Sequence, residues 1–342
     1  MRLSILIFLA AVAALFLLTK IMPNLPATEI ETVVIEPEIP RKVYLGAWVG
    51  GFWTDTTRTL NSSALTSFEK LIDKKVAIAN IYTDWTYLRE PALIKTLNIM
   101  SSNGWTPMIS SNPKFFSSCP DNKKSLYKTV AEGECDDFLR EAAKNLRSYN
   151  KQVFFRFAWE MNLPQMYWSV QFMKSNPSDF KSAWRRLYTI FQEEKAENVI
   201  WVLSFNTSNS KTIPYKELYP GNDYVDWVAI DGYNWGNSQD WSGWTSFNSV
   251  FRSSYNELTA ITSKPVMLSE VNSAPGPKKP EWLRDMLAVQ IPQNFPNVSA
   301  VIFFNENKTE GEDVDWRIEI HQENLSALHD VLDNSIYSSV YP

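Results

Sequence analysis

Residues 153–162 read VFFRFAWEMN, a short run of apolar side chains that ends in polar ones. Runs rich in aromatic and β-branched residues indicate β-strands, and stretches with helical spacing of apolar residues lie between the runs. Strands are predicted at 43–48, 76–82, 106–110, 153–157, 199–204, 225–230, 265–269 and 300–304, and helices at 64–72, 91–101, 135–149, 179–194, 244–261, 281–291 and 324–332. Strand and helix alternating eight times predict a (β/α)8 TIM barrel.

A doubly wound α/β sheet is the alternative fold. Such a sheet usually carries a Gly-rich phosphate loop after its first strand. This chain has only 11 glycines and no G-x-G-x-x-G motif. The barrel is therefore favoured, and a nucleotide cofactor is not expected.

Charge and histidine content exclude several functions. The 342 residues carry 33 basic and 38 acidic side chains, without a basic block that could follow a phosphate backbone, so nucleic-acid binding is not expected. The two histidines, His321 and His329, are too few for multi-histidine zinc sites and do not favour a Ser-His-Asp triad. Acid/base chemistry is assigned to carboxylates, and no metal or cofactor is expected.

The N-terminus resembles a targeting segment. Arg2 precedes a mostly apolar run over residues 3–18, which is shorter than a typical spanning helix and longer than a typical signal core. The alternatives are a cleaved signal, an uncleaved anchor and a buried helix, and the anchor is favoured because no A-x-A site follows. The predicted organisation is a signal peptide or membrane anchor at 1–21, a Pro-rich linker at 22–41 and one catalytic domain at 42–342, outside the cytoplasm.

Cys119 and Cys135 are the only cysteines. An extracytoplasmic location permits disulfides, and the polar segment between the two residues offers no core face. A disulfide on a long loop is predicted, with two buried thiols as the alternative.

Two glutamates follow predicted strands. Glu160 comes after the fourth strand, and Glu270 ends the seventh in KPVMLSEVN, residues 264–272. Barrel active sites form at the carboxyl ends of the strands, and strands four and seven face each other across the mouth. Two such carboxylates suit glycoside hydrolysis. The alternative is that each caps a helix or pairs with an arginine.

Aromatic side chains follow several predicted strands and could stack on the apolar faces of sugar rings. Each one alone could equally belong to the core. The cluster in the polar loop at 233–244 favours a surface groove. The residues concerned are Trp48, Phe52, Trp53, Trp85, Trp168, Tyr233, Trp235, Trp241 and Trp244.

Four segments in order resemble glycoside hydrolase family 26, whose members include β-1,4-mannanases, mixed-linkage β-glucanases and β-1,3-xylanases. They are RFAWEMN at 156–162, YPGNDYVDWVAIDGYNWG at 219–236, KPVMLSEVNSAPGPKKPEWLRDML at 264–287, and VIFFNENK at 301–308 followed by DWRI at 315–318. The resemblance runs from Tyr44 to about Leu332.

The resemblance implies a role for several residues. Glu160 matches the acid/base and Glu270 the nucleophile of a retaining enzyme. Tyr233 matches the tyrosine that supports the nucleophile. Arg156 matches an arginine that keeps nearby carboxylates ionised, with a purely structural ion pair as the alternative. Trp168 and Trp235 fall where the family lines its sugar subsites.

One position departs from the family pattern. Trp159 stands where the family has histidine before the acid/base, and indole can only donate a hydrogen bond. An active enzyme with altered specificity is expected. The alternatives are a carbohydrate-binding protein that cuts poorly and a transglycosylase of the cell envelope.

Some readings stay open from the residues alone. Asn206 contacts substrate or simply ends its strand, and Asp231 is a third acidic site residue or a structural turn, with structure favoured. The acidic loop at 305–316 binds a cation or is solvated, and the solvated loop is favoured. The expected partner is a polysaccharide, with membrane contact only through the N-terminal segment, and the chain is expected to be a monomer.

Overall fold

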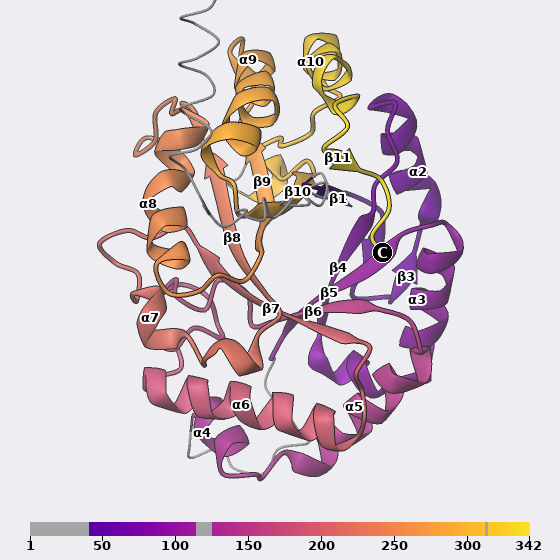
Figure 1. The fold of residues 1–342 in the computed structure, drawn as a ribbon, viewed down its shortest axis with the longest axis vertical. Helices are drawn as coiled ribbons and strands as arrows, with labels where there is room; N and C mark the ends of the chain where they lie inside the picture. Colours follow the sequence, from indigo (N-terminus) through magenta and orange to yellow (C-terminus); the bar gives the residue numbers. More distant parts are fainter. Residues whose placement is uncertain (1–40, 114–124, 312–313) are drawn as a thin grey trace, which may run out of the picture. The chain divides into compact units, whose positions relative to one another are not determined.

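Eight parallel strands close into a barrel (Figure 1). The structure is a computed structural model and describes residues 41–113, 125–311 and 314–342. Each strand pairs with the next, and the last pairs with the first, Val49 lying opposite Asn305. The barrel strands are β1 (Val43–Val49), β4 (Ile78–Asp84), β5 (Thr106–Asn112), β6 (Val153–Phe157), β7 (Val199–Asn206), β8 (Trp227–Asn234), β9 (Val266–Ser273) and β10 (Val298–Asn305). The predicted (β/α)8 barrel is confirmed.

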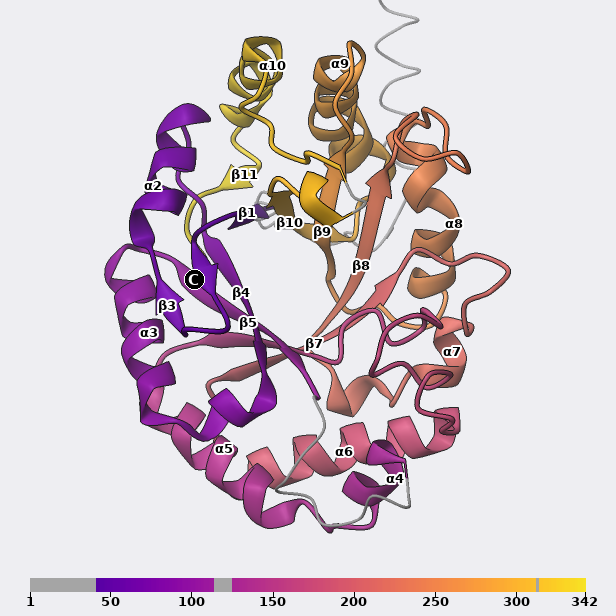
Figure 2. The same ribbon diagram turned by 180° about the vertical axis from the view of Figure 1, so that it is seen from behind.

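Helices surround the barrel on its outer side, as the view from behind also shows (Figure 2). The longer ones are α2 (Ser62–Leu71), α3 (Pro91–Ser102), α5 (Asp136–Tyr149), α6 (Pro177–Glu193), α8 (Phe247–Thr259) and α10 (Gln322–Leu332). Short elements complete the described chain: β2 (Trp53–Thr54), β3 (Thr59–Leu60), η1 (Trp85–Arg89), α4 (Leu126–Ala131), α7 (Tyr215–Leu218), η2 (Asn222–Tyr224), α9 (Lys279–Arg284), η3 (Asp285–Asn294), η4 (Thr309–Gly311) and β11 (Tyr337–Ser338).

Helix α5 illustrates why the outer helices form where they do. Its apolar residues recur every three or four positions and pack on one buried face. Two aspartates in the first turn stabilise the helix because their negative charges lie at the positive end of its dipole. Asn150 ends the helix in a left-handed conformation with φ of 54°. The buried face holds Phe138, Leu139, Ala142, Ala143 and Leu146.

One predicted helix is only partly right. The apolar spacing predicted a single α-helix at 281–291, but α9 ends at Arg284 and the chain continues as the π-helix η3. Pro292 lies inside η3, and its missing N–H cannot continue a regular α-helical ladder.

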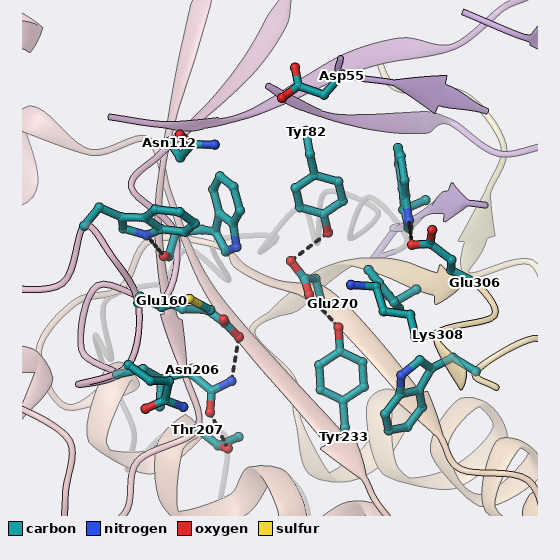
Figure 3. A pocket seen from close by; sticks show the side chains of 18 of the residues that line it. Asp55, Tyr82, Asn112, Glu160, Asn206, Thr207, Tyr233, Glu270, Glu306 and Lys308 are labelled. Atoms are coloured by element: carbon teal, nitrogen blue, oxygen red, sulfur yellow. Dashed lines mark hydrogen bonds between the residues drawn. The ribbon is translucent and has the colours of Figure 1, made fainter. Parts of the chain in front are cut away.

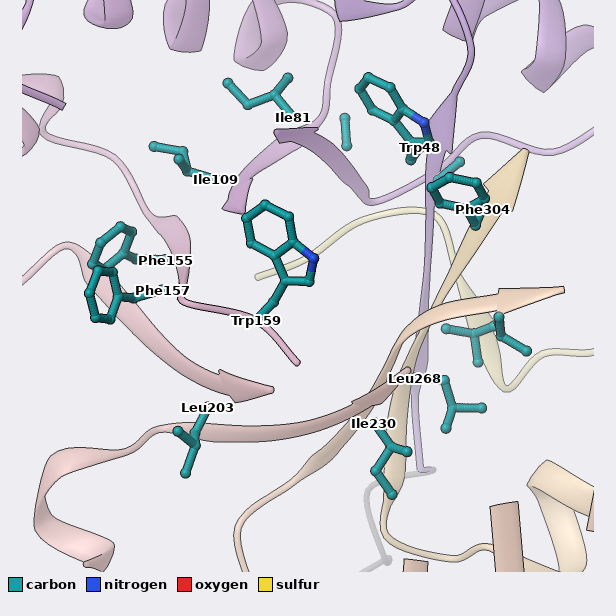
Figure 4. Packing of buried hydrophobic residues seen from close by; sticks show 14 of the residues in the cluster. Trp48, Ile81, Ile109, Phe155, Phe157, Trp159, Leu203, Ile230, Leu268 and Phe304 are labelled. Atoms are coloured by element: carbon teal, nitrogen blue, oxygen red, sulfur yellow. The ribbon is translucent and has the colours of Figure 1, made fainter. Parts of the chain in front are cut away.

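Apolar side chains fill both sides of the barrel wall. In Figure 4, Ile81, Ile109, Phe155, Leu203, Ile230 and Leu268 ring the strands, and Trp159 stands inside that ring. At the amino end of the strands, Tyr341 packs against Tyr44 and Phe154, with ring centroids 4.8 Å apart in both pairs. This end of the barrel is closed by side chains.

The described domain begins at Arg41. Its guanidinium donates to the carbonyl oxygens of Ile291 and Phe295, at 3.0 and 2.9 Å. The predicted signal or anchor at 1–21 and the linker up to residue 40 lie outside the described residues. In the part of the chain that is described, no helix has the length and apolar character that crossing a membrane requires.

Candidate active site

A cavity of about 1200 Å³ opens at the carboxyl ends of the strands (Figure 3). This is the end of a barrel where loops bring polar side chains together. Aromatic rings form much of its wall: Trp48, Trp53, Tyr82, Trp159, Trp168, Tyr233, Trp235, Trp241, Phe304 and Trp316. Four carboxylates also line it, from Asp55, Glu160, Glu270 and Glu306.

Glu270 lies near the end of β9 and is held by three donors. Its Oε1 accepts hydrogen bonds from the Tyr82 hydroxyl at 2.7 Å and from Arg156 Nη1 at 2.8 Å. Its Oε2 accepts one from the Tyr233 hydroxyl. Burial and the Glu270 charge raise the pKa of both Tyr82 and Tyr233, so both phenols remain protonated donors. These three hydrogen bonds, from Tyr82, Arg156 and Tyr233, fix the orientation of the Glu270 carboxylate.

Glu160 follows β6 in a tight turn. Ala158 and Glu160 both have left-handed backbones, with φ of 48° and 56°, which costs about 1–2 kcal/mol for each residue with a Cβ. The Glu160 N–H donates to the Ser204 carbonyl oxygen at 3.1 Å, and this bond helps to fix the turn. The turn directs the Glu160 side chain into the cavity (Figure 3).

The surroundings of Glu160 differ from those of Glu270. Asn206 Nδ2 donates to Glu160 Oε1 at 2.6 Å, but no described cation pairs with this carboxylate. Burial first, then the charges of Asp231 and Glu270, raise the pKa of Glu160 well above its usual value. Glu160 is therefore suited to hold a proton at neutral pH.

An ion pair beneath the cavity supports this arrangement. The fully buried Arg156 pairs with both Asp231 and Glu270, and Ser204 and Ser269 also donate to Asp231. Burial disfavours the guanidinium charge, but the carboxylates of Asp231 and Glu270 raise the pKa of Arg156 above its usual value. Asp231 thus positions Arg156 under Glu270 and does not line the cavity.

Three carboxylates come close enough to share a metal ion. One oxygen each of Glu160, Asp231 and Glu270 lies within 4.8 Å of the others. Arg156 already pairs with two of these groups, so a metal ion bound here would be repelled by the guanidinium charge. The acidic loop at 305–316, outside residues 312–313, contains no such group of three, and its Asp315 pairs with Arg317 at 2.7 Å.

Trp159 forms part of the cavity wall beside Glu160. Its ring lies 4.5 Å from that of Trp168 and 5.3 Å from that of Tyr82, measured between centroids. Trp168 Nε1 donates to the Trp159 carbonyl oxygen at 2.6 Å, which ties the two tryptophans together. On the opposite wall, Trp235 packs against Trp241 and Trp316, at 5.3 and 5.0 Å.

The structure brings the predicted site residues together. Arg156 lies directly beneath the cavity. The other seven line it: Trp159, Glu160, Trp168, Asn206, Tyr233, Trp235 and Glu270. Asn206 both lines the cavity and holds Glu160. Cys135 is buried and no described cysteine is a free thiol, but Cys119 lies outside the described residues, so the disulfide stays a prediction.

Several lining residues were missed from the sequence. Tyr82 is the last residue of the strand predicted at 76–82, and its hydroxyl breaks the apolar pattern at the carboxyl end of that strand. Trp316 stands in the quoted segment DWRI without an assigned role. Glu306 accepts a hydrogen bond from Trp48 Nε1 at 2.8 Å, a contact that no sequence spacing indicates.

Known proteins resemble this chain over most of the described domain. Residues 121–282 match the family model "Glycosyl hydrolase family 26". Endoglucanase H of Acetivibrio thermocellus is 30% identical over 297 residues, which make up 84% of this chain and 30% of that protein. Mannan endo-1,4-beta-mannosidase A and B of Caldalkalibacillus mannanilyticus is 34% identical over 103 residues, 29% of this chain and 20% of that protein. The chain thus spans less than a third of the length of either relative.

Solved structures share the fold at lower identity. A GH26 beta-mannanase from Bacteroides ovatus superimposes with a TM-score of 0.59 at 15% identity, covering 87% of this chain and 90% of that one. The YdhT protein from Bacillus subtilis gives a TM-score of 0.59 at 19% identity, covering 87% and 86%. The family match, the relative aligned along most of the chain and the shared barrel agree with the four segments identified above, and the chain belongs to glycosyl hydrolase family 26.

Proposed function

We propose that the domain is a retaining glycoside hydrolase that cleaves β-linkages in a polysaccharide, with Glu160 as acid/base and Glu270 as nucleophile. The observation that carries the proposal is a close pair of carboxylates in unlike surroundings. Their nearest oxygens lie within 4.8 Å. Retaining enzymes place these groups about 5–5.5 Å apart, whereas inverting enzymes need about 6.5–9.5 Å to admit water between them.

The first half of the reaction forms a glycosyl-enzyme. The ionised Glu270 attacks the anomeric carbon while Glu160 gives its proton to the departing glycosidic oxygen. The raised pKa of Glu160 keeps that proton available, and the donors around Glu270 hold its carboxylate in one orientation. The two environments therefore match the two roles.

The second half releases the sugar. Glu160, now ionised, takes a proton from water, whose oxygen attacks the anomeric carbon and displaces Glu270. The two inversions give net retention. All proton transfers use side chains on the cavity wall.

The aromatic walls suit a glycan chain. Rings from Trp159, Trp168, Trp235 and Trp241 line the cavity, and Trp241, which is 71% exposed, leaves most of its indole free to cover a sugar ring. We expect β-glucan to be the first polymer cleaved, because Endoglucanase H aligns with 84% of the chain. β-Mannan is the second candidate, from the mannosidase that aligns over 103 residues.

Trp159 motivates a second candidate, a protein that binds glycans without efficient cleavage. Indole replaces the family's histidine beside the acid/base and has no acceptor atom for a sugar hydroxyl. Both carboxylates and their hydrogen-bond partners are in place, which favours the enzyme.

The test compares the protein with Glu270→Ala, Glu160→Ala and Glu306→Gln variants on mixed-linkage β-glucan, β-mannan, β-1,3-xylan and bacterial exopolysaccharides. We expect the parent to cleave one polymer and Glu270→Ala to be inactive. Glu160→Ala should also lose polymer cleavage, because the departing sugar oxygen receives no proton, but azide should restore its turnover of a 2,4-dinitrophenyl β-glycoside, whose leaving group needs no proton, through a β-glycosyl azide. Glu306→Gln is the control, since it alters a cavity carboxylate without a proposed catalytic role. Binding of a polymer without cleavage would support the second candidate, and products longer than the substrate would indicate transglycosylation. Cleavage by Glu270→Ala would refute the assignment of the nucleophile.

A further inference from the structure

We propose that Tyr82 is a positioning residue that speeds the release of sugar from Glu270. This inference rests on the proposed function. The Tyr82 hydroxyl donates to Glu270 Oε1 at 2.7 Å. Its ring is held from two sides by Trp48 and Trp159, with centroids 4.9 and 5.3 Å away, so the hydroxyl has little freedom to turn from the carboxylate.

The two oxygens of Glu270 have unequal partners. Oε1 accepts from both Tyr82 and Arg156, whereas Oε2 accepts from Tyr233 alone. A carboxylate oxygen offers about two lone-pair directions, so Oε1 is saturated and Oε2 keeps one. The oxygen with the unused lone pair is the one that can bond to the anomeric carbon.

The covalent step then assigns a state to each oxygen. The Oε2–C1 bond forms, the bond from C1 to the glycosidic oxygen breaks, and the proton of Glu160 goes to that oxygen. Oε1 becomes the carbonyl oxygen of the resulting ester and remains facing Tyr82. When water attacks C1, the Oε2–C1 bond breaks and its electron pair restores the carboxylate.

Tyr82 interacts unequally with these two states. A hydrogen bond to a charged oxygen is stronger than one to a neutral carbonyl. The Tyr82 hydroxyl therefore stabilises the free carboxylate more than the ester. This difference opposes formation of the glycosyl-enzyme and favours its breakdown, and we expect the breakdown rate to depend on Tyr82 by about tenfold.

The test uses Tyr82→Phe, which keeps the ring and removes only the hydroxyl. The matched control is Tyr337→Phe, whose lost hydroxyl donates to the Leu287 carbonyl oxygen outside the cavity. The substrates are 2,4-dinitrophenyl β-cellobioside and β-mannobioside. Their good leaving group makes breakdown limit kcat, while kcat/KM reports formation.

We expect Tyr82→Phe to lower kcat and KM together by about tenfold and to leave kcat/KM unchanged or raised. Intact-mass spectrometry during turnover should find the glycosyl adduct at substrate concentrations where the parent is mostly free. A raised KM, or a fall in kcat/KM without adduct, would overturn the inference and indicate a role in binding or folding. An inactive parent, or an active Glu270→Ala variant, would instead refute the proposed function.

Discussion

Replacing Arg156 by methionine should destabilise the fold strongly at neutral pH and weakly in acid. The guanidinium is fully buried and pairs with Asp231, itself fully buried, and with Glu270, which is 7% exposed. Methionine fills most of the space but leaves two carboxylates without their cation. The loss is electrostatic in origin and does not come from a cavity.

The expected magnitude comes from the partners that are lost. Removing one member of a buried ion pair costs about 3–5 kcal/mol, because the remaining charge is uncompensated. The bond from Arg156 Nη1 to Ser110 at 3.1 Å is lost as well, whereas Nε has no hydrogen-bond partner and contributes nothing. As the pH falls, the Asp231 carboxyl takes up a proton and the loss shrinks, since burial already raises the pKa of Asp231 to about 7 and removal of the cation raises it further.

The assay is urea unfolding at pH 4.5 and 7.5, followed by tryptophan fluorescence. Arg186→Met is the matched control: this arginine pairs with Asp136 at 2.5 Å, but the two side chains are 37% and 24% exposed. The control should lose less than about 1 kcal/mol of unfolding free energy. Equal losses for Arg156→Met at both pH values, or a loss no larger than the control's, would refute the reasoning.

Four further predictions concern the cavity. Glu160→Gln should be more stable than the parent at pH 8 and equal to it at pH 4. A carboxyl whose pKa is raised in the folded state stabilises the fold below its unfolded pKa, and it loses that contribution as the pH rises through the folded pKa. Thermal unfolding measured across this pH range tests the trend. The parent's activity should fall at high pH as Glu160 loses its proton, and a pH profile without that limb would contradict its role as acid. Trp241→Ala should leave the melting temperature unchanged, since Trp241 is 71% exposed. It should raise KM for a polymer about eightfold if a sugar covers about 50 Å² of the indole, and an unchanged KM would exclude Trp241 as a sugar platform. Trp159→His should lower the unfolding free energy by about 2–3 kcal/mol through lost contacts with Trp168 and Tyr82, and urea titration showing a loss under about 0.5 kcal/mol would contradict that packing.

Apolar runs identified the strands because barrel strands are buried on both faces. The strand at 153–157 has the predicted bounds. Others extend further: β8 was predicted to end at Ile230 but continues to Asn234, since Asp231 and Asn234 keep pairing with Glu270 and Ser273 of β9. The side chains at the carboxyl ends of the strands are polar because they face the site. A strand end predicted from apolar residues therefore comes too early, although the backbone pairing continues.

The site was only partly predictable for a related reason. Glu160 and Glu270 stood out as charges directly after or within apolar runs, and their placement in a barrel follows from topology. The three donors on Glu270 come from three different strands, and nothing in the spacing of Tyr82, Arg156 and Tyr233 indicates that they meet on one carboxylate. Likewise, the left-handed turn at Ala158 and Glu160 contains no glycine, so the sequence gives no signal for it.

The ring of Tyr341 at the amino end of the barrel also affects how substrate and product exchange with solvent. Because Tyr341 packs there against Tyr44 and Phe154, the described side chains leave no opening between these three rings. Among the residues that the structure describes, substrate, water and product reach the carboxylates from the carboxyl ends of the strands. A glycan fragment that leaves slowly therefore blocks the next chain, and we expect the accumulated product to act as a competitive inhibitor.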